Sequence, residues 1–467
     1  MKPRITLTLL ALCVLVSSPA RAAGDYIWDF PFGGTTLSEA VLFNAVATDT
    51  SSNVVIAGQF ASGGGGVSFG GAALVSAGGN DVVVAKYNSA GAHQWSKRFG
   101  STGSDVGSGI GTDSSGNVYV IGNFAGTVNF GGSNLVGVGG SDIFLVKLNS
   151  SGTHVWSKMF GGTGNENGLA IAVKADGTLA ITGSFGNFGS AVDFGGGPIA
   201  SHSSNTDIFV AKYDTNGNHL WSKGVGGVGS DSGFGVAIDS TGAVIMTGNF
   251  AGNVSIGCVT LINAGVGSTT DGLIIRYSSG GLVTWLRRFG SDSDDRGSSV
   301  AVNASDEVVV TGGFDGAVTF GGTTRPDSGG GSDIFLAKYS SAGAWMWDSV
   351  FGSSAGFGDS TKGVAVDASG NIAITGSMLN GLNFGGGALC PGCGTYDAFI
   401  AKFTGAGAHV YSDRFDNLTY DEHSLGVAFD ASGNAVIAGD FFDTINLGGG
   451  VRTSTGGTDG FIAKFAP

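Results

Sequence analysis

The chain is poor in charged residues, in proline and in cysteine, and its charge is acidic. Only 12% of its 467 residues are Asp, Glu, Lys or Arg, seven are proline, and the formal net charge is −14. An acidic chain does not favour nucleic acid or an anionic membrane surface, so neither partner is expected. The scarcity of charge also leaves little material for solvated helix faces, and no amphipathic helix is recognisable.

The four cysteines are too few for a disulfide scaffold. Cys13 lies in an apolar N-terminal stretch without the small preceding residue that a lipid-anchor motif requires. Cys390 and Cys393 form a CPGC sequence, for which we predict a small disulfide that stiffens a loop. A redox motif would need a thioredoxin-like helix start, and a zinc site would need a second cysteine pair. Cys258 is left over and is expected to be buried.

The N-terminus has the pattern of a secretory signal peptide. Lys2 and Arg4 precede an apolar core over residues 5–16, and Ala20 to Ala22 offer a small-residue cleavage site. The core is too short to be a permanent membrane span. We therefore predict a signal peptide over residues 1–22 and a product that is secreted, periplasmic or attached to the cell surface.

Glycine is abundant, with 88 residues, while 42% of the chain is hydrophobic. That much apolar material excludes a disordered low-complexity chain, and the glycines lack a collagen period. They stand instead in turns between short apolar segments.

A sequence of about 63 residues repeats along the chain. Segments such as DVVVAKY recur seven times, 61 to 65 residues apart, beginning at Asp81, Asp142, Asp207, Asp271, Asp333, Asp397 and Asp459. Each of the first six continues through a short turn into a segment centred on Trp or Tyr. A third segment, such as DSSGNVYVIGNF at Asp113, recurs in the same order. Self-similarity at this period is typical of repeat architectures.

Each repeat contains four short strands, which we name A to D in chain order. They are rich in Val, Ile, Phe and Ala and are bounded by Gly, Asn, Ser and Asp. Several are apolar on both faces, as in DIFLVKL at Asp142. Strands buried on both sides, with no helices, favour a β-propeller over the alternative, a β-solenoid with shorter rungs.

The two ends of the chain supply parts of one repeat. YIWDFPFGG at residues 26–34 has no repeat upstream, and the last copy, at Asp459, lacks the aromatic segment that should follow it. The N-terminal strand would therefore complete the C-terminal blade and leave no open sheet edge. We predict an all-β, seven-bladed β-propeller with four antiparallel strands per blade, spanning residues 24–467 as a single domain and expected to be monomeric.

The repeat also resembles a known family. GVAVDASGNIAITG at residues 363–376 is similar to the repeat motif of the bacterial SBBP-type β-propeller family, and the resemblance covers essentially the whole chain after residue 22. It implies a propeller at or outside a bacterial cell surface, and it implies no activity. The fourth blade and the repeat at Asn303 depart most from the pattern.

Propeller topology sorts the loops by face. The A–B and C–D turns should share one face, and the longer B–C and D–A loops should form the other, which we call the long-loop face and where we expect binding. Acidic residues gather on the long-loop face; either each carboxylate caps its own turn, or together they bind Ca²⁺ or a cationic partner. The best single Ca²⁺ candidate is Asp292, Asp294 and Asp295, although it lacks the pattern of a 12-residue calcium loop.

Two other residue types recur in register. His93, His154, His219 and His409 each stand two residues before the aromatic residue, on different blades, so we expect packing rather than metal binding. A basic residue ends every strand C, and in most repeats we expect it to meet a repeated Asp of the A–B turn, which is Asp49, Asp113, Asp239, Asp367 or Asp430. We expect these pairs to be partly exposed, structural and weak; the basic residues are Lys86, Lys147, Lys212, Arg276, Lys338, Lys402 and Lys464.

Positions near the axis, at the start of strand A, are mostly small or apolar and lack a repeated carboxylate pair. We therefore expect no catalytic residues and no cofactor beyond the possible Ca²⁺. The predicted function is a secreted or surface binding or scaffold module for a protein or glycan. The alternative is an extracellular propeller enzyme, a hydrolase or lyase, with an axial active site.

Overall fold

The computed structural model describes residues 22–467, with the exception of residues 35, 37, 187–188, 266–268, 330, 354–357, 380, 390–393 and 417–418. The predicted signal peptide, apart from Ala22, and the predicted Cys390–Cys393 disulfide lie outside these residues and stay predictions. No helix in the described part is long and apolar enough to cross a membrane.

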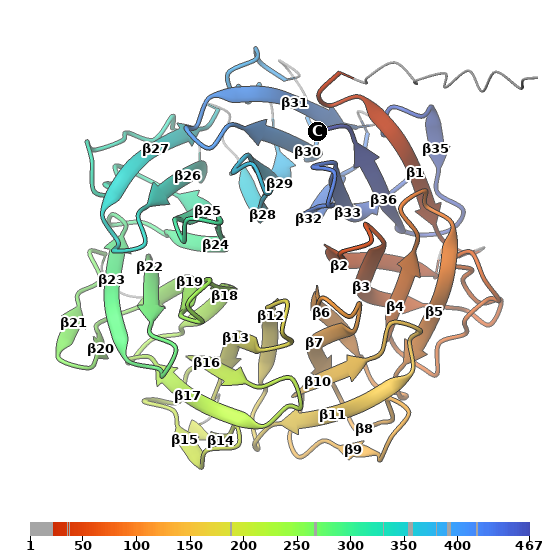
Figure 1. The fold of residues 1–467 in the computed structure, drawn as a ribbon, viewed down its shortest axis with the longest axis horizontal. Coiled ribbons are helices and arrows are strands. Elements are labelled where there is room, and N and C mark those ends of the chain that lie inside the picture. The colour runs from red at the N-terminus through yellow and green to blue at the C-terminus, as the bar shows by residue number, and fades with distance from the viewer. Residues whose placement is uncertain are drawn as a thin grey trace, which may run out of the picture.

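Seven four-stranded antiparallel sheets stand as blades around one axis, which confirms the predicted propeller (Figure 1). Strand A is innermost and strand D outermost in every blade. The A strands, from blade 1 to blade 7, are β2 (Ala40–Thr48), β6 (Val106–Thr112), β12 (Asn167–Val173), β18 (Ser232–Ile238), β24 (Arg296–Val302), β28 (Ser360–Val366) and β32 (His423–Phe429). The B strands are β3 (Val54–Ala61), β7 (Val118–Phe124), β13 (Leu179–Phe185), β19 (Val244–Ala251), β25 (Val308–Phe314), β29 (Ile372–Met378) and β33 (Ala435–Phe441).

The C strands are β4 (Asp81–Tyr87), β10 (Asp142–Leu148), β16 (Asp207–Tyr213), β22 (Thr270–Tyr277), β26 (Asp333–Tyr339), β30 (Asp397–Phe403) and β36 (Asp459–Phe465). The D strands are β5 (His93–Phe99), β11 (His154–Phe160), β17 (His219–Val225), β23 (Val283–Phe289), β27 (Trp345–Phe351), β31 (His409–Phe415) and, in blade 7, β1 (Tyr26–Phe32). The seventh blade is thus built from both ends of the chain, in the order β32–β33–β36–β1.

Each B–C connection folds back on itself as a small hairpin, which the repeat pattern did not predict. Four of these hairpins are two-stranded sheets: β8 (Thr127–Val128) with β9 (Leu135–Val136), β14 (Ala191–Asp193) with β15 (Pro198–Ala200), β20 (Val254–Ile256) with β21 (Val259–Leu261), and β34 (Thr444–Asn446) with β35 (Val451–Thr453). The other three are held by single bridges, at Val67–Leu74, Val318–Arg325 and Asn383–Ala388. Figure 1 shows the labelled hairpins outside the D strands.

The hydrophobic core lies between neighbouring blades. Strands B and C are buried on both sides because each blade is covered by the next. One cluster, for example, joins Val82 and Val84 of blade 1 to Val120 and Phe144 of blade 2. Alternation of buried and exposed faces is therefore lost, as the apolar pattern of these segments predicts.

A repeated contact links the outer edge of each blade to the next. The indole N–H of Trp95, in blade 1, donates to the carbonyl of Ser150 in the C–D turn of blade 2, at 3.0 Å. Gly152 in that turn has a positive φ of 77°, and a Cβ there would lie 2.8 Å from the Trp95 ring. Only glycine satisfies both the turn and the stacked indole, which explains the glycine of each C–D turn.

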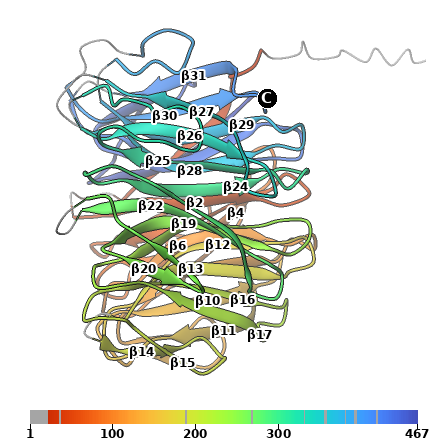
Figure 2. The same cartoon turned by 90° about the vertical axis from the view of Figure 1, so that its left-hand side faces the viewer.

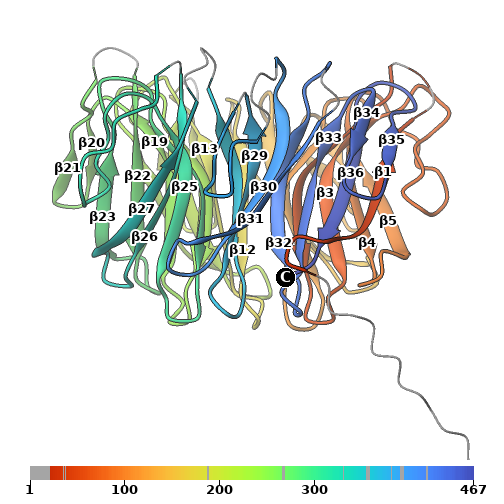
Figure 3. The ribbon, with the colours of Figure 1, turned by 90° about the horizontal axis from the view of Figure 1, so that it is seen from above.

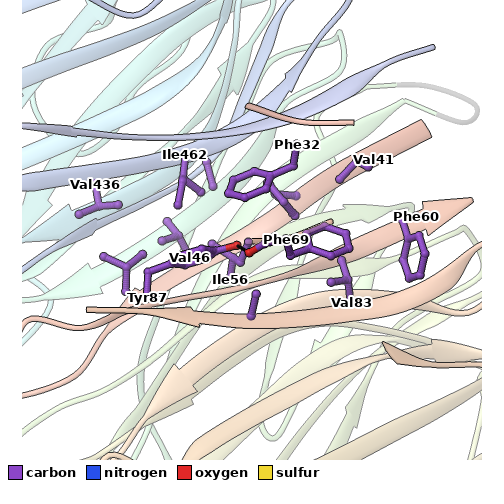
Figure 4. Close-up of a cluster of buried hydrophobic side chains, with 14 of the residues drawn as sticks. Phe32, Val41, Val46, Ile56, Phe60, Phe69, Val83, Tyr87, Val436 and Ile462 are labelled. Carbon is purple, nitrogen blue, oxygen red and sulfur yellow. Dashed lines mark hydrogen bonds between the residues drawn. The ribbon is translucent and has the colours of Figure 1, made fainter. Parts of the chain in front are cut away.

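The ring closes with the same contacts. Trp28 of β1 and Lys464 of β36 both donate to the carbonyl of Ser89 in blade 1, at 3.2 and 3.1 Å. Phe32 packs against Phe43 of blade 1. It also packs against Phe69 of the same blade (Figure 4). The predicted closure by the N-terminal strand is therefore confirmed.

The missing C–D turn of blade 7 is replaced by the two chain ends. Ala466 N donates to Asp25 O, and Gly24 N donates to Ala466 O, as Asn88 N donates to Ala92 O within an intact turn. Gly24 has the same positive φ, 83°, as the turn glycine of blade 1. It lies against Tyr411, which takes the place of the tryptophan in blade 6.

The two faces of the ring carry different connections. Viewed from the side, the strands run between the faces, with β20, β34 and β35 towards one face and the C-terminus at the other (Figure 3). A second side view shows the blades packed one against the next around the ring (Figure 2). The C-terminus follows β36, which is a strand C, so it lies on the face that carries the C–D turns. The B–C hairpins lie towards the opposite face, the long-loop face, as predicted.

Candidate functional site at the axis of the ring

Strand A of every blade contains a β-bulge. In blade 2 the register shifts between Gly107 and Gly109, so Ser108 is the extra residue. The same shift recurs in the other six blades. The seven extra residues, which we call the bulge ring, are Asn44, Ser108, Leu169, Phe234, Ser298, Lys362 and Leu425.

A glycine in strand B makes room for each bulge. A Cβ on Gly122 would lie 1.9 Å from the carbonyl oxygen of Val106, and one on Gly376 would lie 2.0 Å from that of Ser360. No other residue fits such a close approach of two backbones. Gly376 closes the GVAVDASGNIAITG motif, so the repeat itself carries a sequence signal for the bulge, although the bulge was not among the expected features.

The bulge ring lines the axial channel. All seven residues face one cavity of about 420 Å³, together with Val106, Asn123 and Arg296. Bulges re-aim side chains, and they are common beside binding sites. Val106 and Arg296 are first residues of their A strands, so the cavity opens towards the long-loop face. The small or apolar positions at the start of strand A do lie at the axis, as expected.

Two cations face the cavity within an acidic protein. Arg296 and Lys362 line it from neighbouring blades, and neither forms an ion pair with any described residue. Burial, and then repulsion by Arg296, lowers the pKa of Lys362. Burial also lowers the pKa of Arg296, although Asp294 opposes the shift. Lys362 is exposed and Arg296 is half-buried, so both charges are accessible to an anion that enters the channel, and neither has an ion-pair partner among the described residues.

Most acidic residues of the long-loop face are individually buried. Asp105 accepts hydrogen bonds from the backbone N–H groups of Ser101 and Ala125, and Asp231 from those of Gly227 and Ala251. The strand-C aspartates are likewise bonded to the preceding loop, as Asp81 is to Ala77 N. These contacts confirm the turn-capping interpretation of these acids.

The three Ca²⁺ candidates have separate surroundings. Asp295 is buried and accepts from Ser291 N and Asp315 N, whereas Asp294 accepts from Thr270 N. Asp292 is exposed. Within the described ranges no three His, Cys, Asp or Glu side chains are grouped to hold a metal ion. Calcium binding at these residues stays a prediction.

We expect the protein to be more stable at pH 5 than at pH 8. Burial, and then nearby strand-C carboxylates, raises the pKa of Asp231, Asp295 and Asp359 to about 7, from an ordinary value of 3.8. A carboxyl whose pKa is raised by folding stabilises the fold below its unfolded pKa, and this contribution is lost as the pH rises through about 7. Calorimetry should show a melting temperature that falls from pH 5 to pH 8. The half-buried His93, His154 and His219, whose pKa burial lowers, act in the opposite direction. The fall should therefore be smaller in D231N/D295N/D359N, and an equal fall in that variant would contradict the assignment.

The recurrent histidines are structural. His93 packs its ring over Gly70 and Gly71 of the hairpin and beside Tyr87, and its Nε2 lies 3.2 Å from Ser96 Oγ. The equivalent histidines make the same contact with a serine three residues later. We expected packing beside the tryptophan; the partners are the hairpin glycines, because the hairpin folds over the outer strand.

Five of the seven recurrent basic residues pair with a turn aspartate, and Lys338 pairs with Glu307 instead; the basic side chains are mostly buried rather than partly exposed. Lys86 and Asp49 lie 2.9 Å apart with side chains 3% and 4% exposed, and Lys464 pairs with Asp430 in the same way. The neighbouring blade covers the pair, which explains why the expectation of exposure was wrong. Lys212 is an exception, because Lys174 takes the place of the turn aspartate, and its Nζ donates to the carbonyl of Gly242 instead.

Cys258 is exposed, contrary to the expectation that it is buried. It lies in the turn of the β20–β21 hairpin, at the outer rim of blade 4. An outer hairpin has no neighbouring blade to cover it.

Comparison with known proteins agrees with the fold. The SBBP family model, a beta-propeller repeat, matches residues 94–123, which cover strand D of blade 1 and strands A and B of blade 2. The chain is 25% identical over 372 residues to the regulatory protein FlaEY of Caulobacter vibrioides, covering 76% of this chain and 38% of that protein. It is 24% identical over 459 residues to the uncharacterized WD repeat-containing protein L264 of Acanthamoeba polyphaga mimivirus, covering 81% and 33%.

The chain thus spans well under half the length of these two relatives. Among solved structures, Sqt1 from Chaetomium thermophilum matches with a TM-score of 0.43 and 11% identity, over 95% of this chain and 99% of that one. None of these likenesses assigns an activity.

Proposed function

We propose that this protein is a secreted, periplasmic or cell-surface binding module that holds an anionic group of a glycan or protein at the axial channel. The observation that carries the proposal is the pair Arg296 and Lys362, which face one cavity without an ion-pair partner among the described residues. A bound carboxylate or sulfate would supply the missing counter-charge through charge-assisted hydrogen bonds.

The rest of the cavity suits recognition of a sugar or peptide. Ser108 and Ser298 offer hydroxyl groups, while Leu169, Phe234 and Leu425 offer apolar surface. Mixed walls of this kind, with a few convergent polar groups, are typical of ligand sites. The long-loop face around the opening would add the contacts that distinguish one ligand from another.

The proposal is tested by titrating glucuronate-containing oligosaccharides and matched neutral glucose oligosaccharides into the protein, with calorimetric detection. We expect the acidic series to bind more tightly. R296Q and K362Q should each weaken that binding by about tenfold or more, since a hydrogen bond to a charged group is worth about 1.5–3 kcal/mol. The matched control is K97Q, which removes the same charge from the outer strand β5. Equal affinity in wild type and in both axial variants would reject the proposal.

A second candidate, an extracellular hydrolase or lyase, has one observation in its favour. His423 begins strand A of blade 7, and its Nδ1 lies 3.3 Å from Asp440 Oδ2. That hydrogen bond raises the pKa of the imidazole, whereas the charge of Lys362 opposes the shift. A histidine oriented by a carboxylate can act as a general acid or base. Turnover of a polysaccharide that disappears in H423A, while binding persists, would favour the enzyme.

A further inference from the structure

In six of the seven blades the B–C hairpin is clamped onto the outer strand by the first side chain of that strand, and in blades 1, 3 and 5 a tyrosine hydrogen bond is added. The two turn glycines of the hairpin receive the first side chain of strand D, as Gly195 and Gly196 receive His219. That side chain is fixed by the residue three positions later, Ser222 in this blade. A tyrosine at the end of strand C, Tyr213, donates its hydroxyl to the carbonyl of Phe194 in the hairpin, at 2.8 Å. Blades 1 and 5 have the same tyrosine bond.

Blade 4 lacks the glycine pair, the side chain that the pair receives and the residue that fixes this side chain. Ile256-Gly257-Cys258 replaces the Phe-Gly-Gly turn, Val283 replaces the histidine, and Leu286 replaces the serine. Tyr277 is retained, and it is 1% exposed. Its hydroxyl has no hydrogen-bond partner among the described residues, unlike its counterparts in blades 1, 3 and 5.

A groove of about 760 Å³ takes the place of the clamp. The β20–β21 hairpin lies outside the outer strand β23 (Figure 1). Residues of both elements line the groove, together with Tyr277. Its apolar wall is open to solvent, with Leu282 74% and Val283 38% exposed. The groove is distinct from the axial cavity, which shares no lining residue with it.

We propose that this blade-4 groove binds a small, largely apolar molecule that offers one hydrogen-bond acceptor to the Tyr277 hydroxyl. The volume falls within the range of small-molecule sites, about 300–1,000 Å³. A buried hydroxyl without a partner costs free energy, so a ligand that satisfies it gains affinity. Burial raises the pKa of Tyr277, which keeps the hydroxyl protonated and able to donate.

The rim narrows the choice of ligand. Lys223 lines the groove and forms no ion pair with a described residue, so an anionic substituent at the outer end would be favoured. The apolar walls favour an aromatic or branched aliphatic body. An aromatic molecule with a carbonyl at its inner end, and optionally an acidic group at its outer end, fits these three features.

The first test uses the fluorescence of 1-anilinonaphthalene-8-sulfonate, an apolar anionic probe. We expect one saturable site in the wild-type protein and loss of binding in V283W, because the larger ring fills the groove as Trp345 fills the equivalent place in blade 5. V155W, which places the same ring on the exposed outer strand of blade 2, should bind the probe normally. Undiminished binding by V283W would overturn the proposal. A concentration-dependent dimer that V283W abolishes would overturn it too, because a second copy would then occupy the groove.

The second test addresses the hydroxyl. Displacement of the probe by 2-acetylnaphthalene should be about threefold to tenfold tighter than displacement by 2-isopropylnaphthalene, which has the same shape without the acceptor. This preference should disappear in Y277F. Since the hydroxyl has no partner among the described residues to lose, Y277F should keep the wild-type melting temperature, whereas Y213F should melt lower. A preference that survives in Y277F, or no preference in the wild type, would contradict the assignment.

Discussion

Removing residues 26–34 is expected to abolish cooperative folding of the ring. Blade 7 would lose its outer strand β1, which pairs along its length with β36. It would also lose Trp28 and Phe32 from the core between blades 7 and 1. Truncating one large buried aromatic residue costs about 3–5 kcal/mol, and two of them approach the whole stability of a typical domain, about 5–15 kcal/mol.

Differential scanning calorimetry on a chain starting at Ala22, with and without residues 26–34, measures this effect. A synthetic peptide of residues 24–34 should restore part of the melting transition when added in excess, because it can re-form β1. W221A is the matched internal control, because it removes the same inter-blade contact without opening a chain end. An unchanged transition after the deletion would contradict closure by the N-terminal strand.

K86A is expected to lower the free energy of unfolding by about 3–5 kcal/mol, the cost of breaking a buried ion pair. Asp49 would be left buried and without its cation. Burial alone would raise the pKa of this carboxyl, and the hydrogen bond from Lys86 is the first of the contacts that lower it instead. The penalty comes mainly from the stranded carboxylate rather than from the lost attraction.

The double variant D49N/K86M should therefore recover most of the loss. Asparagine keeps the turn cap, as Asn303 does in blade 5, where it accepts from Ser305 N and Glu307 N. Methionine keeps the apolar stem of the lysine. Urea unfolding of the wild type, K86A and the double variant gives the three free energies. If K86A costs less than about 1 kcal/mol, the value typical of an exposed pair, the pair does not behave as buried.

The large-scale architecture could be predicted because it repeats. Seven copies of each segment fixed the number of blades, and the split repeat at the two ends indicated how the ring closes. Local features that depend on neighbouring blades were harder to predict. Whether Lys86 is buried depends on the turn of blade 2, which no pattern within one repeat reveals.

The axial site was harder still to predict from the sequence, because it depends on backbone geometry. A bulge moves one residue of strand A towards the axis, and the residue types themselves, Asn, Ser, Leu, Phe and Lys, follow no pattern. The glycine of strand B marked the position, but its meaning is clear only once the two backbones are seen together. The sequence indicated the blade-4 groove only indirectly, because the fourth blade departs from the repeat pattern.

The central functional claim is that Lys362 and Arg296 bind an anionic group in the axial channel. It is tested most directly by following the titration of Lys362 by NMR in protein carrying ¹³C-labelled lysine, with K362Q to assign the signal. We predict a pKa below the ordinary lysine value of 10.5 in the free protein. Saturating glucuronate should raise this pKa, because a bound carboxylate favours the charged ammonium group. An ordinary lysine pKa that does not respond to the anion would contradict the claim.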